Sequence, residues 1–232
     1  MQELFAKLFW KNEEISHAVA CLCEDIPGYQ TAKAEYEQVL SQVQEIIGFE
    51  LCNQLLERLT VRQLVLPDVT PEEPLRLEIE AAAAAWGADI LWVDRDLELP
   101  LGDARLRIYA PLGAGSANEE GLSVLCSSGE FDTLLTGDMD VSIERRLVKY
   151  GDLPDIELLV AGHHGSKYAS SQELLLAVRP EYAVISVGYN RYGHPAPEAL
   201  ERLAAAGCAL YRTDWMGSVT FMTAAQPAPT TH

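Results

Sequence analysis

The chain has 232 residues, 48% of them hydrophobic, which is enough to bury the core of one large domain or two small ones. Its formal net charge of −18 excludes a broadly basic nucleic-acid-binding face, because affinity for phosphates comes mainly from Lys and Arg. No run of about 18 apolar residues occurs, so we predict no membrane span. The mixed charges of the first residues argue against a secretory signal, and five cysteines without CxxC spacing favour a cytoplasmic protein with reduced thiols.

Residues 1–60 are expected to form a helical hairpin or a small bundle. Apolar residues recur every three or four positions in ELFAKLFW and SHAVACLCEDI, and again beyond the PGYQ break. His17 is alone in this segment and is interpreted as a structural or surface histidine. The segment either packs over the rest of the chain or forms a bundle core of its own, and both alternatives remain open.

After Thr60 the pattern changes to strands mixed with helices. We predict strands in VRQLVLPD and ILWVD around a helix in TPEEPLRLEIEAAAAAWGAD, then hairpins in LELPLGDARLRIYAP and LSVLCSSGEFDTLLTGD. Helices and strands are expected to alternate from Met139 onward, with helices at 140–150, 171–179 and 196–206, and strands at 156–161, 182–187, 208–212 and in GSVTFMT. This order indicates an α/β layered sandwich over residues 61–223, followed by a disordered tail at 224–232.

Three of the predicted strands end in loops that carry ligand-type residues. LLTGD places Asp138 after one strand, VAGHHGS places His163 and His164 after the next, and SVGYNRYGHP places His194 after a third. Sites gather at the strand ends of α/β sheets, and a carboxylate with imidazoles is a ligand set that divalent transition metals prefer. Each residue also has a structural explanation: Asp138 suits the N-cap of the next helix, and His194 precedes a proline that suits a first helical turn.

The same motifs carry a family resemblance. TGD, HHGS and YGHP occur in this order, and with YRTDWMGSVTF they make residues 61–223 resemble the later half of the metallo-β-lactamase-like domain of ComEC-type competence proteins. The resemblance implies half of a four-layer αββα sandwich, a binuclear site that often holds zinc or manganese, and hydrolysis of phosphodiesters, plausibly of DNA. It implies metal ligands at Asp138 and His164, and phosphate or acid/base contacts at His163, Ser166, Lys167 and His194.

The resemblance is incomplete. The family's HxHxDH motif, which supplies most of the metal ligands, is absent from this sequence. One carboxylate with one or two imidazoles is fewer than the three protein ligands usual for a catalytic zinc. Because half a sandwich exposes the apolar inner face of its sheet, we expect residues 1–60 or a second copy of the chain to cover that face.

Three functional hypotheses follow. The first is a catalytically impaired relative of the metal-dependent phosphodiesterases and nucleases of DNA uptake, acting as a binding or scaffold domain with an incomplete metal site or none. The second is an active zinc- or manganese-dependent hydrolase completed by a partner chain. The third is a metal-free phosphate- or nucleotide-binding module that uses the glycine-rich loop from Gly162 to Lys167. Whether the protein binds nucleic acid stays open in all three.

Overall fold

The computed structural model describes residues 61–69, 74–113 and 120–222. Within these ranges, residues Leu77–Gly87 fall in one compact unit, and Arg62–Arg76 with the chain from Ala88 onward fall in another. The predicted helical module at 1–60 and the predicted tail at 224–232 lie outside the described residues. In the described part of the chain, no helix has both the length and the apolar character needed to cross a membrane.

The predicted alanine-rich helix is confirmed as α3 (Pro74–Trp86). Proline suits the first turn, because its missing N–H would have no helical partner there. Five consecutive alanines, the residue of highest helix propensity, then carry the helix forward. The helix ends before Gly87, whose φ of +72° is the left-handed conformation common just after a helix.

Two of the predicted strands, both in the larger unit, form a small parallel pair. β1 (Gln63–Pro67) pairs with β2 (Asp89–Val93) in register along its whole length. The Arg76 guanidinium lies 3.6 Å from the centre of the Trp92 ring and donates a hydrogen bond of 2.9 Å to Asp68.

The other seven described strands form one mixed sheet, with neighbours following chain order from β3 to β9. An antiparallel meander makes one half, from β3 (Leu97–Leu101) and β4 (Ala104–Tyr109) to β5 (Ser123–Ser128) and β6 (Phe131–Leu135). The other half runs parallel to β6 and contains β7 (Leu158–Val160), β8 (Tyr182–Ile185) and β9 (Ala209–Arg212). The carboxyl ends of β6, β7, β8 and β9 therefore meet at one edge of the sheet.

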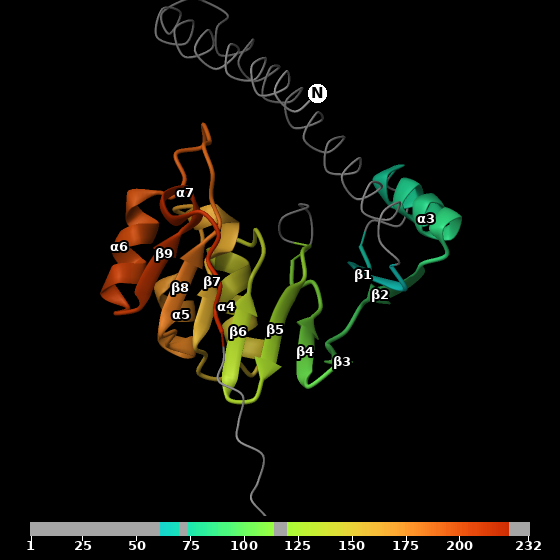
Figure 1. The fold of residues 1–232 in the computed structure, drawn as a ribbon, viewed down its shortest axis with the longest axis horizontal. Coiled ribbons are helices and arrows are strands. Elements are labelled where there is room, and N and C mark those ends of the chain that lie inside the picture. The colour runs from blue at the N-terminus through green and yellow to red at the C-terminus, as the bar shows by residue number, and fades with distance from the viewer. Residues whose placement is uncertain (1–60, 70–73, 114–119, 223–232) are drawn as a thin grey trace, which may run out of the picture. The chain divides into compact units, whose positions relative to one another are not determined.

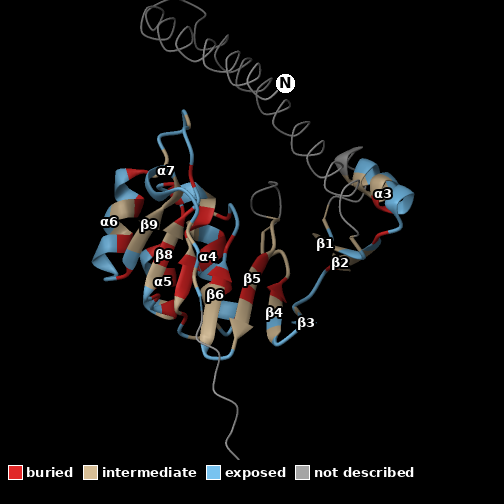
Figure 2. Cartoon of the chain, in the orientation of Figure 1, coloured by how far each residue is buried: buried red, intermediate tan, exposed pale blue. Residues whose placement is uncertain are grey.

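Three helices connect the parallel strands: α4 (Val141–Tyr150), α5 (Gln172–Val178) and α6 (Pro197–Ala205). Because β6 to β9 follow one another in order and such crossovers are right-handed, all three helices lie on the same face of the sheet (Figure 1). The core forms between these layers, where Leu134, Leu159 and Ala183 are completely buried (Figure 2). The predicted α/β layered fold is confirmed.

The opposite face of the sheet is less covered. Side chains alternate along a strand, so Leu135, Val160 and Val184 point away from the helices, and Leu135 is 39% exposed. The C-terminal segment crosses this face: the Phe221 ring centre lies 5.4 Å from that of Tyr182 (Figure 1).

The strand predicted in GSVTFMT is wrong for the part described, because residues 217–222 form no ladder. A short helix, α7 (Thr213–Met216), comes first and ends at Gly217, whose φ is +70°. Phe221 then packs its ring between Tyr182, Tyr211 and Phe131, so side-chain contacts across the face hold the segment instead of backbone pairing at the edge.

We expect the packing of β7 under the helices to dominate stability. Leu159→Ala should lower the free energy of unfolding by about 2–5 kcal/mol, because it removes fully buried methyl groups and leaves a cavity. The matched control is Leu176→Ala on α5, where the side chain is 68% exposed and the loss should stay within about 0.5 kcal/mol. Urea denaturation of both variants measures the difference, and equal losses would contradict this description of the core.

Candidate functional site

The three loops with ligand-type residues converge at the carboxyl edge of the sheet. Asp138 follows β6, the pair His163–His164 follows β7, and His194 lies in the loop after β8. The backbone N–H of His163 donates to the carbonyl of Gly137 at 3.0 Å, which ties the first two loops together. Parallel pairing of the three strands therefore brings together residues that are up to 56 positions apart, counting from Asp138 to His194.

Both histidines of the pair have a left-handed backbone. His163 has φ 47° and ψ 44°, and His164 has φ 53° and ψ 29°. Such conformations cost on the order of 1–3 kcal/mol for each non-glycine residue, and they cluster at functional sites. The bend is locked by Gly165, where φ is +80° and a Cβ would lie 2.7 Å from the Cβ of Pro195. The carbonyl of Gly165 accepts from Ala196 at 2.8 Å, which fixes the third loop to the second.

His164 is oriented by a backbone carbonyl and faces Asp138. Its Nδ1 lies 2.8 Å from the oxygen of Ser186, and its Nε2 lies 3.9 Å from Oδ1 of Asp138. A carbonyl only accepts, so the tautomer with its proton on Nδ1 fits this contact and directs the lone pair of Nε2 toward the carboxylate. The two side chains are 55% and 45% exposed, so a ligand can reach the gap between them. This is the orientation in which metal-binding histidines are usually held.

His194 lies between two other rings. Its ring centre is 5.6 Å from that of His163 in an edge-on contact and 5.9 Å from that of Tyr192 in a stacked contact. Burial lowers the pKa of His194 below its usual value, repulsion from His163 and His164 lowers it further, and Asp138 opposes the shift. The imidazole is therefore held neutral near pH 7, and its buried Nδ1 has no hydrogen-bond partner among the described residues.

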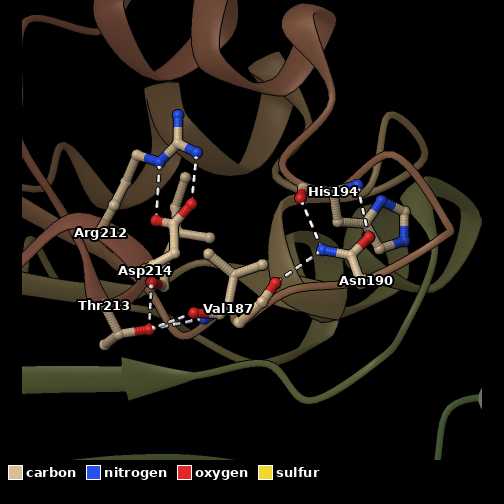
Figure 3. A network of polar contacts seen from close by, with 8 residues as sticks. Val187, Asn190, His194, Arg212, Thr213 and Asp214 are labelled. Carbon is tan, nitrogen blue, oxygen red and sulfur yellow. Dashed lines mark hydrogen bonds and ion pairs between the residues drawn. The ribbon is translucent and has the colours of Figure 1, made fainter. Parts of the chain in front are cut away.

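Asn190 closes the loop that carries His194 (Figure 3). Its amide nitrogen donates to the carbonyls of Gly188 at 2.9 Å and His194 at 2.8 Å, and its amide oxygen accepts from the N–H of His194 at 3.0 Å. Thr213 fixes the start of the same loop, because its hydroxyl donates to the carbonyl of Val187 at 2.7 Å and accepts from the Val187 N–H at 2.8 Å. These side chains shape the site and have few groups left for a ligand.

Ser166 and Lys167 follow the two histidines along the chain, and the contacts of their side chains are with Tyr168. Ser166 is 3% exposed, and its hydroxyl accepts from the N–H of Tyr168 at 3.3 Å. The ammonium of Lys167 lies 4.8 Å from the centre of the exposed Tyr168 ring. The structure thus gathers Asp138, both adjacent histidines and His194, whereas the Ser166 hydroxyl is turned into its own loop.

Two charged side chains that the sequence did not reveal, one buried and one partly buried, bond to the backbone of the segment after the histidines. Glu144 of α4 is completely buried and accepts from the N–H groups of Ser170 at 2.6 Å and Ser171 at 2.7 Å. Burial raises the pKa of Glu144, and these hydrogen bonds oppose that rise. Arg202 of α6 donates to the carbonyls of Lys167, Ala169 and Ser170. A polar residue on an amphipathic helix is normally assigned to solvent, so periodicity alone could not find this support.

A hollow of about 440 Å³ opens beside His164, over the ends of β8 and β9. Its walls are the loop after β8, with Tyr192 and His194, and Thr213 at the start of α7. A volume of this size lies within the range of small-molecule sites.

The described residues hold no complete set of metal ligands. Among residues 61–69, 74–113 and 120–222 there is no group of three or more His, Cys, Asp or Glu side chains placed to hold a metal ion. The structural interpretation of Asp138 as the N-cap of the next helix is wrong. The N-cap of α4 is Asp140, whose carboxylate accepts from the N–H groups of Ser142 and Ile143. Asp138 is thus left available for a ligand.

Three curated proteins are similar in sequence, although no protein-family model matches the chain. ComE operon protein 3 of Bacillus subtilis is 29% identical over 170 residues, which are 72% of this chain and 22% of that protein. Competence protein ComA of Neisseria gonorrhoeae is 49% identical over 90 residues, 38% of this chain and 13% of that protein. Recombination protein 2 of Haemophilus influenzae is 36% identical over 103 residues, 44% of this chain and 13% of that protein. The chain spans less than a quarter of the length of these relatives.

The solved structures with a distant likeness to this chain include two proteins. CmlA, a diiron beta-hydroxylase from Streptomyces venezuelae, has a TM-score of 0.46 and 12% identity, and the match covers 69% of this chain and 40% of that one. Zinc-bound PqqB from Methylobacterium extorquens has a TM-score of 0.37 and 10% identity, covering 68% and 66%.

The two neighbouring aspartates should behave differently when truncated. Asp140→Ala should lower the free energy of unfolding by about 0.5–2 kcal/mol, because it removes the cap of α4. Asp138→Ala should change it by less than about 0.5 kcal/mol, because no helix depends on that carboxylate. Denaturant unfolding compares the two variants. A larger loss of unfolding free energy in Asp138→Ala than in Asp140→Ala would show that Asp138 has a structural role.

The protonation of His164 can be tested directly. In the neutral ring we expect the proton on Nδ1, because the Ser186 carbonyl accepts it. Long-range ¹H–¹⁵N correlation spectra distinguish the two ring nitrogens. A dominant Nε2–H form would show that the lone pair points away from Asp138.

Proposed function

We propose that this relative of the ComEC-type competence proteins presents one side of a divalent-metal centre that acts on phosphodiesters. Asp138 and His164 would hold the metal, and His163 and His194 would contact the phosphate. By itself the described part of the chain binds these groups without hydrolysing them. Hydrolysis requires further ligands from a partner chain.

The observation that carries the proposal is the preset orientation of His164. Its Nδ1–H is bonded to the Ser186 carbonyl, and its Nε2 faces an exposed carboxylate 3.9 Å away. A carboxylate oxygen and an imidazole nitrogen suit zinc and manganese. The left-handed backbone at both histidines is a cost that a purely structural turn could avoid with glycine.

The number of donors limits what this half-site does alone. Two protein ligands are fewer than the three that catalytic zinc sites usually have. When bound in a complete site, the metal would polarise the phosphoryl oxygens and supply hydroxide near neutral pH. The contribution of this chain is to hold the phosphate against the imidazoles, and a neutral His194 is able to accept a proton there.

The imidazoles are better placed than the backbone to bind a phosphate. An anion-binding loop needs free N–H groups, but two of those between Gly162 and Lys167, at His163 and Ser166, already donate to backbone carbonyls. This favours the metal-linked function over a metal-free phosphate-binding loop.

The names of the relatives, which refer to competence and recombination, favour DNA as the phosphodiester. With a net charge of −18, the protein cannot hold DNA by general attraction. Contact would be confined to the edge of the sheet where the histidines gather.

Metal titration with matched variants tests the proposal. We expect the full chain to bind Co²⁺ weakly, and Asp138→Asn and His164→Gln each to lower the affinity about tenfold or more, because each removes a ligand. Asp140→Asn is the control, since asparagine caps helices well and no ligand is lost. The d–d absorption of Co²⁺ reports binding.

Activity is measured in the same samples with bis(p-nitrophenyl) phosphate. The chain alone should not exceed the rate of the metal ion in buffer. If metal affinity is unchanged in Asp138→Asn and His164→Gln, these two residues do not bind the metal and the proposal is refuted. If the chain alone hydrolyses the substrate in a metal-dependent way, the claim that its metal site is incomplete is refuted.

A further inference from the structure

Exposed aromatic rings gather at the same edge of the sheet as the histidines. Six Tyr and Trp side chains in the described part of the chain are more than 40% exposed. Four of them lie in segments that follow β7, β8 and β9, and they are Tyr168, Tyr189, Tyr192 and Trp215. Isolated exposed aromatics are ordinary, but a set that surrounds one site indicates a binding surface.

The loop after β8 carries two of these rings and projects beyond the edge of the sheet (Figure 1). Tyr189 is 82% exposed and Tyr192 is 65% exposed. Between them in the sequence, the Asn190 amide bonds to the backbone of Gly188 and His194 (Figure 3). These hydrogen bonds fix the conformation of the loop that carries both rings.

Tyr192 also forms a wall of the hollow beside His164. Its ring stacks on His194 with an angle of 24° between the planes. Of the polar side chains that line the same hollow, Asn190 is bonded to the backbone of its own loop, and Thr213 of α7 is bonded to Val187 of that loop. The Tyr192 ring therefore gives the hollow an aromatic wall, which suits a flat group recognised by stacking.

Cations accompany two of the other rings. The Lys167 ammonium lies 4.8 Å from the centre of the Tyr168 ring. The Arg212 guanidinium lies 3.7 Å from that of Trp215 and is also paired with the Asp214 carboxylate. Aromatic rings with cations beside them are typical of surfaces on which the bases of single-stranded nucleic acid stack. Bases inside a duplex do not present their faces in this way.

We infer that the hollow beside His164 is a subsite for an unpaired nucleobase, with Tyr192 as the residue that stacks on it. This inference rests on the proposed function, because the base would belong to the nucleotide whose phosphate lies at the histidines. It makes single-stranded nucleic acid the ligand class. In a chain this acidic, phosphate contacts contribute little affinity, so stacking decides which phosphodiesters are retained.

The test uses the full chain with three probes at low salt: a short mixed-sequence DNA single strand, an abasic strand of the same length, and the corresponding duplex. Fluorescence anisotropy measures binding. The single strand should bind roughly five- to hundredfold more tightly than the abasic strand, which has the same phosphates but no bases. Tyr192→Ala should remove this preference, and Tyr192→Phe should retain it.

Tyr150→Ala is the matched control, because that tyrosine is 62% exposed on α4 and lies outside the hollow. It should leave the preference unchanged. Equal binding of the abasic and normal strands, tighter binding of the duplex, or an unchanged preference in Tyr192→Ala would each overturn the subsite. If the subsite fails in this way but Co²⁺ binding still depends on Asp138, the proposed metal function stands. If Co²⁺ binding does not depend on Asp138 either, the subsite and the proposed function are both refuted.

Discussion

The hydrogen bond between the His164 ring and the Ser186 carbonyl is the interaction on which the site depends. It crosses from the loop after β7 to the residue that follows β8. By fixing the proton on Nδ1, it decides that the other nitrogen faces Asp138. Without it, the same ring could turn either nitrogen toward the carboxylate, and the pair would have no preferred chemistry.

The rest of the fold holds this one contact in place. The parallel order of β6, β7 and β8 brings the three loops to one edge of the sheet. The helices α4, α5 and α6 bury one face of these strands and so hold them in place. Glu144 and Arg202 then satisfy backbone groups of the segment after the histidines. Removing either side chain would leave backbone groups of this segment without their hydrogen-bond partners, which is destabilising.

Much of this could be predicted from the sequence. Periodicity and turn residues located both hairpins and every helix from 140 to 206, and the order of TGD, HHGS and YGHP indicated the resemblance to ComEC-type competence proteins that the comparisons confirm. The convergence of Asp138 with the histidines followed from strand order. Local signals could not reveal the ends of the strands: the one predicted at 182–187 stops at Ile185, because Ser186 and Val187 bond to side chains of distant loops. The sequence did not predict the role of Glu144 or the helix α7 for the same reason. Glu144 bonds to Ser170 and Ser171, and Thr213 of α7 bonds to Val187, all distant in sequence.

The most direct measurement is a crystal structure of the chain soaked in zinc, with the ion located by its anomalous scattering. The account predicts a zinc ion bound by the Asp138 carboxylate and by Nε2 of His164, at roughly 2.0–2.2 Å from each, with Nδ1 still bonded to Ser186. A zinc ion bound elsewhere while this pair stays empty, or coordination through Nδ1, would contradict it.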